Sequence, residues 1–153
     1  MTKILFVCHG NICRSPMAEF IFKDLAEKNG LADRFYIASA ATSREELGNP
    51  VYPPARAMLA SKGISCSGKT AVQMTARDYE LYDHIIGMEE VNVRNILRII
   101  PGDHEGKVCR LLDFSDHPRD IADPWYTGDF QTTYDDILEG CLALLKYIEG
   151  TMK

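Results

Sequence analysis

Short apolar runs alternate with longer amphipathic stretches along this chain, and the alternation predicts strands and helices in turn. Strands are predicted over four apolar runs, which are Lys3–Val7, Phe35–Ala38, His84–Gly87 and Val108–Leu112. Helical spacing of apolar side chains predicts helices over Pro16–Asn29, Pro54–Lys62, Glu89–Ile99 and Thr132–Gly150. Elements that alternate in this order are typical of an α/β domain with a parallel sheet.

The first predicted helix has a strong start signal. Ser15 is a residue type that caps helix N-termini well, and Pro16 suits the first helical position. The apolar run Ile4-Leu5-Phe6-Val7 ends shortly before this signal. We therefore expect a strand, a tight loop and a helix in direct succession.

Two long segments, Ala40–Pro53 and Asp113–Gln131, lack a periodic pattern. Loops of this length inside a compact domain are commonly functional. Both segments follow predicted strands, and ligands of open parallel sheets bind beyond the carboxyl ends of the strands. We expect the two segments to wall a pocket at that edge.

The composition restricts the class of protein. A chain of 153 residues is expected to form one domain, here 1–153, and 46% apolar with 25% charged residues is typical of soluble globular proteins. The net charge of −5 argues against non-specific nucleic-acid binding. No apolar run approaches the roughly 20 residues of a membrane span.

The chain has five cysteines, which are Cys8, Cys13, Cys66, Cys109 and Cys141. Their odd number, and an N-terminus that enters a strand-like stretch without a signal peptide, favour a reducing cytoplasm over a disulfide framework. Only Cys8 and Cys13 are close in sequence, and no second cysteine or histidine pair follows at zinc-ligand spacing. We expect neither a metal nor a cofactor.

The loop between the first strand and the first helix carries the main candidate chemistry; its sequence is Cys8-His9-Gly10-Asn11-Ile12-Cys13-Arg14-Ser15-Pro16. Backbone N–H groups of a tight loop at a helix N-terminus attract oxyanions. A thiol in that field ionises readily, because the dipole and Arg14 stabilise its anion. The planar guanidinium also suits bidentate contact with a phosphoryl group. The loop predicts a phosphate cradle with Cys8 as the nucleophile.

A second candidate element is Asp123-Pro124-Trp125-Tyr126, in the later irregular segment. Without the Cys8 loop, Asp123 would be interpreted as a turn-forming residue. A thiolate that attacks a phosphate ester leaves an oxygen that needs a proton, and a positioned carboxylic acid can supply it. The proline would stiffen this acid's loop, and the two aromatic residues would offer faces for a flat substrate group.

Together these motifs resemble the low-molecular-weight protein tyrosine phosphatase family. The likeness covers essentially the full chain and continues through Met17-Ala18-Glu19, Ser39-Ala40-Ala41-Thr42-Ser43, Gly48-Asn49-Pro50 and Gly87-Met88. The resemblance implies a four-stranded parallel sheet flanked by helices on both faces, with the phosphate-binding loop at the end of strand 1. It also implies metal-independent hydrolysis of phosphotyrosine, or of small aryl phosphates, through a phosphocysteine intermediate.

The resemblance also implies roles for individual residues. Cys8 would be the nucleophile, and Arg14 would bind the phosphoryl oxygens and stabilise the transition state. Asp123 would protonate the leaving oxygen and then act as base for the hydrolytic water. The backbone cradle would be formed by His9, Gly10, Asn11, Ile12, Cys13 and Arg14.

Further residues would support this site. Ser15 would donate a hydrogen bond to the Cys8 thiolate. Asn11 would adopt a left-handed conformation, which asparagine tolerates, and Ser39 would help to hold it there. The walls that accept the phosphotyrosine ring would be Leu47, Trp125 and Tyr126.

The chain departs from the family pattern at two positions and raises a redox question at a third. His9 stands where an apolar residue is common. Lys69 lies near the position of a frequent histidine that supports the phosphate loop, so the support of Asn11 stays open. Cys13 either packs inside the loop or traps an oxidised Cys8 as a disulfide.

Three other functions could use a similar loop. An arsenate reductase would need further shuttling cysteines close together, and a phosphocarrier would pass its phosphate on rather than release it. A silent phosphate-binding module would need no nucleophile. The presence of Arg14 with Asp123 favours hydrolysis, and we expect a cytoplasmic monomer that acts on a phosphotyrosine-containing protein or a small aryl phosphate.

Overall fold

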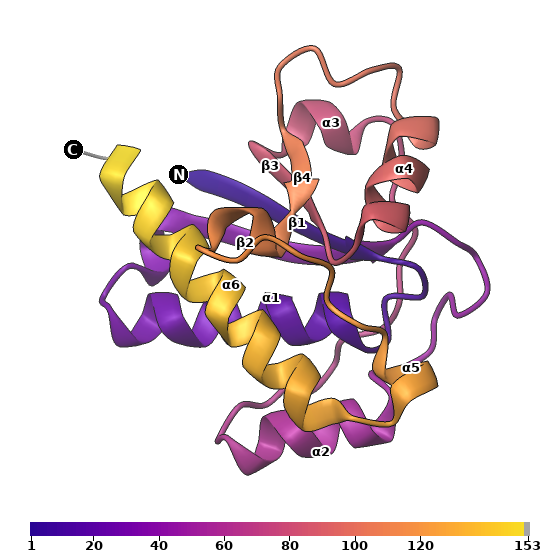
Figure 1. The fold of residues 1–153 in the computed structure, drawn as a ribbon, viewed down its shortest axis with the longest axis vertical. Coiled ribbons are helices and arrows are strands. Elements are labelled where there is room, and N and C mark those ends of the chain that lie inside the picture. Colours follow the sequence, from indigo (N-terminus) through magenta and orange to yellow (C-terminus); the bar gives the residue numbers. More distant parts are fainter. Residues whose placement is uncertain (152–153) are drawn as a thin grey trace.

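The computed structural model describes residues 1–151, and the last two residues of the predicted domain 1–153 lie outside it. The predicted parallel sheet is confirmed, with four strands in the order β2-β1-β3-β4 and parallel pairing throughout (Figure 1). The strands are β1 Thr2–Cys8, β2 Phe35–Ala41, β3 His84–Gly87 and β4 Val108–Arg110.

Helices cover both faces of the sheet (Figure 1). The helices α1 Arg14–Lys28, α2 Pro53–Ser61 and α6 Phe130–Thr151 pack on one face, and α3 Asp78–Leu81 and α4 Glu90–Ile99 pack on the other. A short helix, α5 Pro124–Thr127, precedes α6, and two 3₁₀ turns are η1 Ala32–Arg34 and η2 Leu111–Phe114. No helix of residues 1–151 has the length and hydropathy that crossing a bilayer requires.

The central strand β1 explains why the fold is organised around the start of the chain. Ile4 and Phe6 belong to the core under α1 and α6, whereas Leu5 and Val7 belong to the core under α4. A parallel strand buried on both faces is a continuous apolar run, as this segment is. The end of β1 therefore lies in the middle of the sheet's carboxyl edge.

The start of α1 differs from the prediction. The helix begins at Arg14, with Cys13 at the N-cap position, so Ser15 is not the capping residue. The backbone oxygen of Cys13 accepts the hydrogen bond from Met17 N at 3.1 Å. The Ser15 hydroxyl instead contacts Cys8 and Asn11, because the loop draws it inward.

Other predicted boundaries of strands and helices also differ from those in the structure. The fourth strand ends at Arg110 and not at Leu112, because Asp113 accepts from the backbone N–H of Arg110 at 2.8 Å and turns the chain into η2. The second strand continues to Ala41, three residues beyond the predicted Ala38. The later irregular segment contains α5, which the sequence pattern did not predict.

Helix α6 approaches η2 closely at Gly140. A Cβ added to this glycine would lie 2.5 Å from Leu111 Cγ, and Leu111 is fully buried. A second glycine of the same helix, Gly150, has no heavy atom within 4 Å of such a Cβ. Contact with η2 therefore requires glycine at 140 and not at 150.

We expect Gly140→Ala to destabilise the protein. The overpacking cost of about 1–3 kcal/mol exceeds the helix-propensity gain of about 1 kcal/mol. Gly150→Ala, which gains propensity without a clash, is the matched control and should be as stable as the wild type or more so. Urea unfolding of both variants measures the difference, and a Gly140→Ala variant more stable than the wild type would contradict this packing.

Candidate active site

A cavity of about 130 Å³ opens at the carboxyl end of β1. The two irregular segments predicted to wall a pocket both contribute to it. Its lining residues are Cys8, His9, Gly10, Ile12, Cys13, Arg14, Glu45, Glu46, Asp123, Trp125 and Tyr126. The structure thus brings the predicted nucleophile, arginine and carboxylic acid to one cavity.

The Cys8 loop (residues 8–15) leaves its backbone donors available. Within the described chain, the N–H groups of residues 9–13 make no hydrogen bond to a protein acceptor. The carbonyl groups of the loop point away and accept from its neighbours, as in Thr42 N to Cys8 O at 3.0 Å and Tyr52 N to Ile12 O at 2.8 Å. Unpaired N–H groups at a helix N-terminus form an anion-binding site.

Asn11 holds this loop in shape. Its φ of 58° is the left-handed conformation that was predicted, and it is the only such non-glycine residue in 1–151. The side-chain Nδ2 donates to Ser15 Oγ at 2.7 Å and to Ser39 Oγ at 2.9 Å. Its Oδ1 accepts from Val72 N at 3.2 Å, which fixes the orientation of the amide.

Cys8 has a different environment from the other cysteines. Its Sγ lies 3.0 Å from Ser15 Oγ, at the base of the loop. Burial is the main cause that raises the pKa of the other four thiols, to about 12 for Cys13 and for Cys109. These four thiols stay protonated near neutral pH, which disfavours each of them as a nucleophile.

Arg14 is a buried cation, only 2% exposed, held by three partners. Its Nη1 donates to the backbone oxygen of Ile121 at 2.9 Å. Its Nη2 lies 3.0 Å from Glu89 Oε1 and 3.3 Å from Asp123 Oδ2. These contacts hold the guanidinium at the cavity wall, where it can bind the oxygens of an anion.

Glu89 is a site residue that the sequence analysis missed. It follows β3 and is the N-cap of α4, with the backbone N–H of Glu89 bound to Asn92 Oδ1 at 3.0 Å. The predicted helix Glu89–Ile99 includes Glu89, for which no role was predicted. The sequence did contain a sign that Glu89 lies at the site, because Glu89 comes shortly after the strand β3. The carboxyl end of β3 lies beside that of β1 in the parallel sheet.

Asp123 is held in place from both sides of its carboxylate. One oxygen, Oδ1, accepts from Trp125 N at 3.0 Å and caps α5, and the other, Oδ2, accepts from Arg14. Proline at the first position of α5 stiffens the segment, as predicted for Pro124. The carboxylate is thus fixed beside the Cys8 loop, where it can exchange a proton with a bound group.

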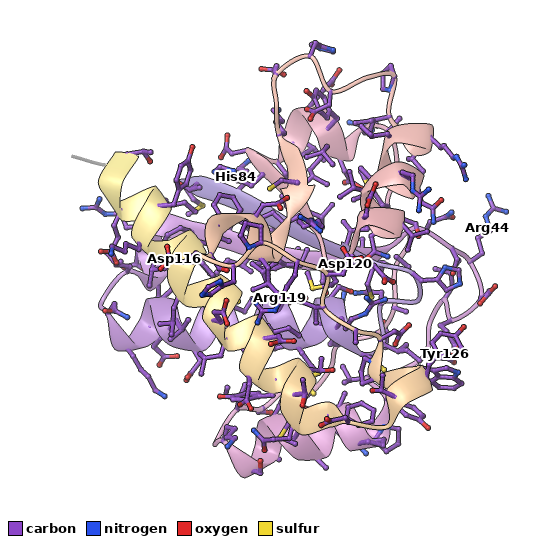
Figure 2. All side chains as sticks on the ribbon, viewed as in Figure 1. Arg44, His84, Asp116, Arg119, Asp120 and Tyr126 are labelled. Atoms are coloured by element: carbon purple, nitrogen blue, oxygen red, sulfur yellow. The ribbon has the colours of Figure 1, made fainter. Side chains whose placement is uncertain are left out.

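Of the three residues predicted to wall the cavity, Trp125 and Tyr126 line it and Leu47 does not. Trp125 packs on Tyr52, with ring centroids 4.8 Å apart, while Tyr126 is 85% exposed and projects from α5 at the edge of the molecule (Figure 2). Leu47 is 44% exposed and does not line the cavity. Glu45 and Glu46, from the turn after β2, line the cavity instead.

His9 and Lys69, the two departures from the family pattern, both have acidic partners. The His9 Nε2 lies 3.0 Å from Glu45 Oε2 at the exposed rim. The Lys69 Nζ donates to the backbone oxygen of Ser39 at 2.9 Å and lies 3.8 Å from Glu19 Oε1.

Residues 1–151 contain no cluster of three His, Cys, Asp or Glu side chains suited to a metal ion.

Comparison with known proteins agrees with this geometry. The family model described as low molecular weight phosphotyrosine protein phosphatase matches residues 3–153. The chain is 38% identical over 151 residues to the low molecular weight protein-tyrosine-phosphatase YfkJ of Bacillus subtilis, covering 97% of each chain. It is 36% identical over 149 residues to PtpA of Staphylococcus aureus, covering 97% of this chain and 94% of the relative.

Solved structures share the whole fold. The crystal structure of YfkJ superposes with a TM-score of 0.95 over 100% of this chain and 98% of that one. A protein tyrosine phosphatase from Entamoeba histolytica, 26% identical, superposes with a TM-score of 0.92 over 100% of both chains. The match in fold, length and sequence shows that this chain belongs to the low molecular weight phosphotyrosine protein phosphatase family.

Proposed function

We propose that this tyrosine phosphatase hydrolyses phosphotyrosine in two steps, with Cys8 as nucleophile, Arg14 as phosphoryl ligand and Asp123 as acid and base. The observation that carries the proposal is the position of the Cys8 thiol at the base of a loop whose backbone N–H groups are unpaired. Arg14 and Asp123 line the same cavity.

In the first step the Cys8 thiolate attacks phosphorus. A sulfur–phosphorus bond forms, and the bond from phosphorus to the tyrosine oxygen breaks. The leaving oxygen takes the electron pair and a proton from Asp123. The loop N–H groups and Arg14 stabilise the charge on the three remaining phosphoryl oxygens.

In the second step water attacks the phosphocysteine. Asp123, now a carboxylate, accepts a proton from the water while the sulfur–phosphorus bond breaks. The departing Cys8 thiolate accepts a hydrogen bond from Ser15, 3.0 Å away, which makes sulfur a better leaving group. Inorganic phosphate is released, and the Cys8 thiolate and the protonated Asp123 are restored.

The substrate class follows from the cavity walls. Trp125 and Tyr126 offer aromatic faces to a phosphorylated ring, and Trp125 is held by its packing on Tyr52. Phosphotyrosine in a protein, or a small aryl phosphate, fits such a slot. A phosphocarrier would gain nothing from an acid beside the leaving oxygen, and arsenate reduction is disfavoured because Cys66, Cys109 and Cys141 do not line the cavity.

We also propose that the protein acts as a cytoplasmic monomer. All five cysteines are free thiols, which suits a reducing compartment. All of the proposed site residues come from one chain, so a single copy is sufficient for the chemistry.

We expect Cys8→Ser to lower turnover of 4-nitrophenyl phosphate to the background rate, because a serine hydroxyl does not ionise in this pocket as a thiol does. Steady-state release of nitrophenolate measures the effect. Cys109→Ser, outside the cavity, is the matched control and should keep wild-type activity. Turnover by Cys8→Ser at the wild-type rate would refute the proposed nucleophile.

Asp123→Asn should slow phosphotyrosine hydrolysis by about 10²–10⁴-fold, the usual contribution of a general acid. Asparagine keeps an oxygen for the cap of Trp125 N, so α5 should stay in place. In the first step, a nitrophenyl ester should lose less than a phenyl ester, because its leaving oxygen needs no proton. Equal losses in the first-turnover rate for both esters would contradict an acid role.

Removal of divalent metal ions should leave the rate unchanged. The proposed mechanism stabilises phosphoryl charge with Arg14 and backbone N–H groups alone. Assays with and without excess EDTA, after gel filtration, provide the measurement. Loss of activity that is restored by a single metal ion would contradict the mechanism.

A further inference from the structure

Lys69 is a mostly buried cation that the proposed mechanism does not use. Its side chain is 12% exposed, and burial lowers its pKa, with the negative charge of Glu19 opposing the shift. Loss of hydration makes a buried ammonium costly. The groups that compensate this ammonium therefore indicate what Lys69 does in the fold.

The contacts of Lys69 lead to the buried carboxylate of Glu19, which is 5% exposed. Lys69 Nζ lies 3.8 Å from Glu19 Oε1, and Lys23 Nζ lies 2.6 Å from Oε2. Two ammonium groups thus compensate the charge of one buried carboxylate. The same Oε1 accepts from Ser39 Oγ at 2.6 Å, and Lys69 also binds the backbone oxygen of Ser39 at 2.9 Å.

From Glu19 a relay of hydrogen bonds with a defined direction reaches the nucleophile. The Ser39 hydroxyl donates to Glu19, so its lone pairs accept from Asn11 Nδ2 at 2.9 Å. Asn11 Nδ2 also donates to Ser15 Oγ at 2.7 Å. The Ser15 hydroxyl accepts there and keeps its own proton, which it can donate to the Cys8 thiolate, with Oγ 3.0 Å from Sγ.

We propose that Lys69 is a positioning residue for Cys8, which acts by compensating Glu19 and anchoring Ser39 so that the relay ends with Ser15 donating to the thiolate. The inference rests on the proposed function and extends it. It assigns a task to a residue at which the chain departs from the family pattern. The relay joins α1, β2 and the segment before α3 to one sulfur atom.

Lys69→Met removes the positive charge with little change in side-chain length, and so tests whether that charge is needed. We expect kcat for 4-nitrophenyl phosphate to fall about tenfold, equivalent to about 1.4 kcal/mol, and KM to change less than about twofold. The loss falls on kcat because Arg14 and the loop N–H groups, which bind the phosphoryl group, are not altered. Lys69→Arg keeps the charge and should retain most of the activity.

The rate at which iodoacetamide alkylates Cys8 at neutral pH gives a second readout, located by peptide mass mapping. It should slow in Lys69→Met, because the thiolate loses the hydrogen bond from Ser15. Lys28→Met is the matched control, since Lys28 pairs with Asp24 at 2.8 Å on the exposed surface of α1. This control should leave both kcat and alkylation unchanged.

A double-variant cycle separates the relay from a general effect on folding. Ser39→Ala breaks the same relay, so Lys69→Met with Ser39→Ala should be no slower than the slower single variant. Thermal unfolding checks each variant, and Lys69→Gln replaces Lys69→Met if the methionine variant does not fold. The proposal would be overturned if the losses of kcat in the two single variants multiply in the double variant. It would also be overturned if the uncharged Lys69 variant, methionine or glutamine, keeps kcat within about twofold of the wild-type value.

The outcomes also separate this inference from the proposed function. An inactive Cys8→Ser together with unaffected Lys69 variants would refute the relay alone. An active Cys8→Ser would refute the proposed function itself.

Discussion

The left-handed backbone of Asn11, held by its own side chain, is the constraint on which the site depends. Its amide binds Ser15, Ser39 and the backbone of Val72, which belong to three separate parts of the chain. These bonds offset the cost of a positive φ in a residue that has a Cβ. With the loop turned in this way, its carbonyl groups accept hydrogen bonds from the surrounding chain and its N–H groups stay free of protein acceptors.

Arg14 ties the same loop to the rest of the carboxyl edge. Its partners are Glu89, at the start of α4, and Ile121 and Asp123, in the segment before α5. The guanidinium is therefore held before any anion binds, and little side-chain entropy is lost on binding. Asp123 shares this contact, so one interaction joins the proposed phosphoryl ligand to the proposed proton donor.

Local pattern was sufficient to predict the fold, and part of the site, from the sequence. The four strands and the long helices have strong apolar periodicity, and Cys8, Arg14 and Asp123 lie in motifs with a direct chemical meaning. The errors have long-range causes. Ser15 looks like a cap, but Cys8 and Asn11 take its hydroxyl. Glu89 and Lys69 contact Arg14 and Glu19 only because folding places residues distant in sequence side by side.

The most direct test of the proposed mechanism is detection of the covalent intermediate. The Asp123→Asn variant is mixed with 4-nitrophenyl phosphate, quenched in acid within the first turnover, and analysed by peptide mass and fragmentation. We predict one phosphoryl group on Cys8, in an amount that matches a burst of nitrophenolate. Release of phosphate without any covalent adduct, or an adduct on Cys13, would contradict it.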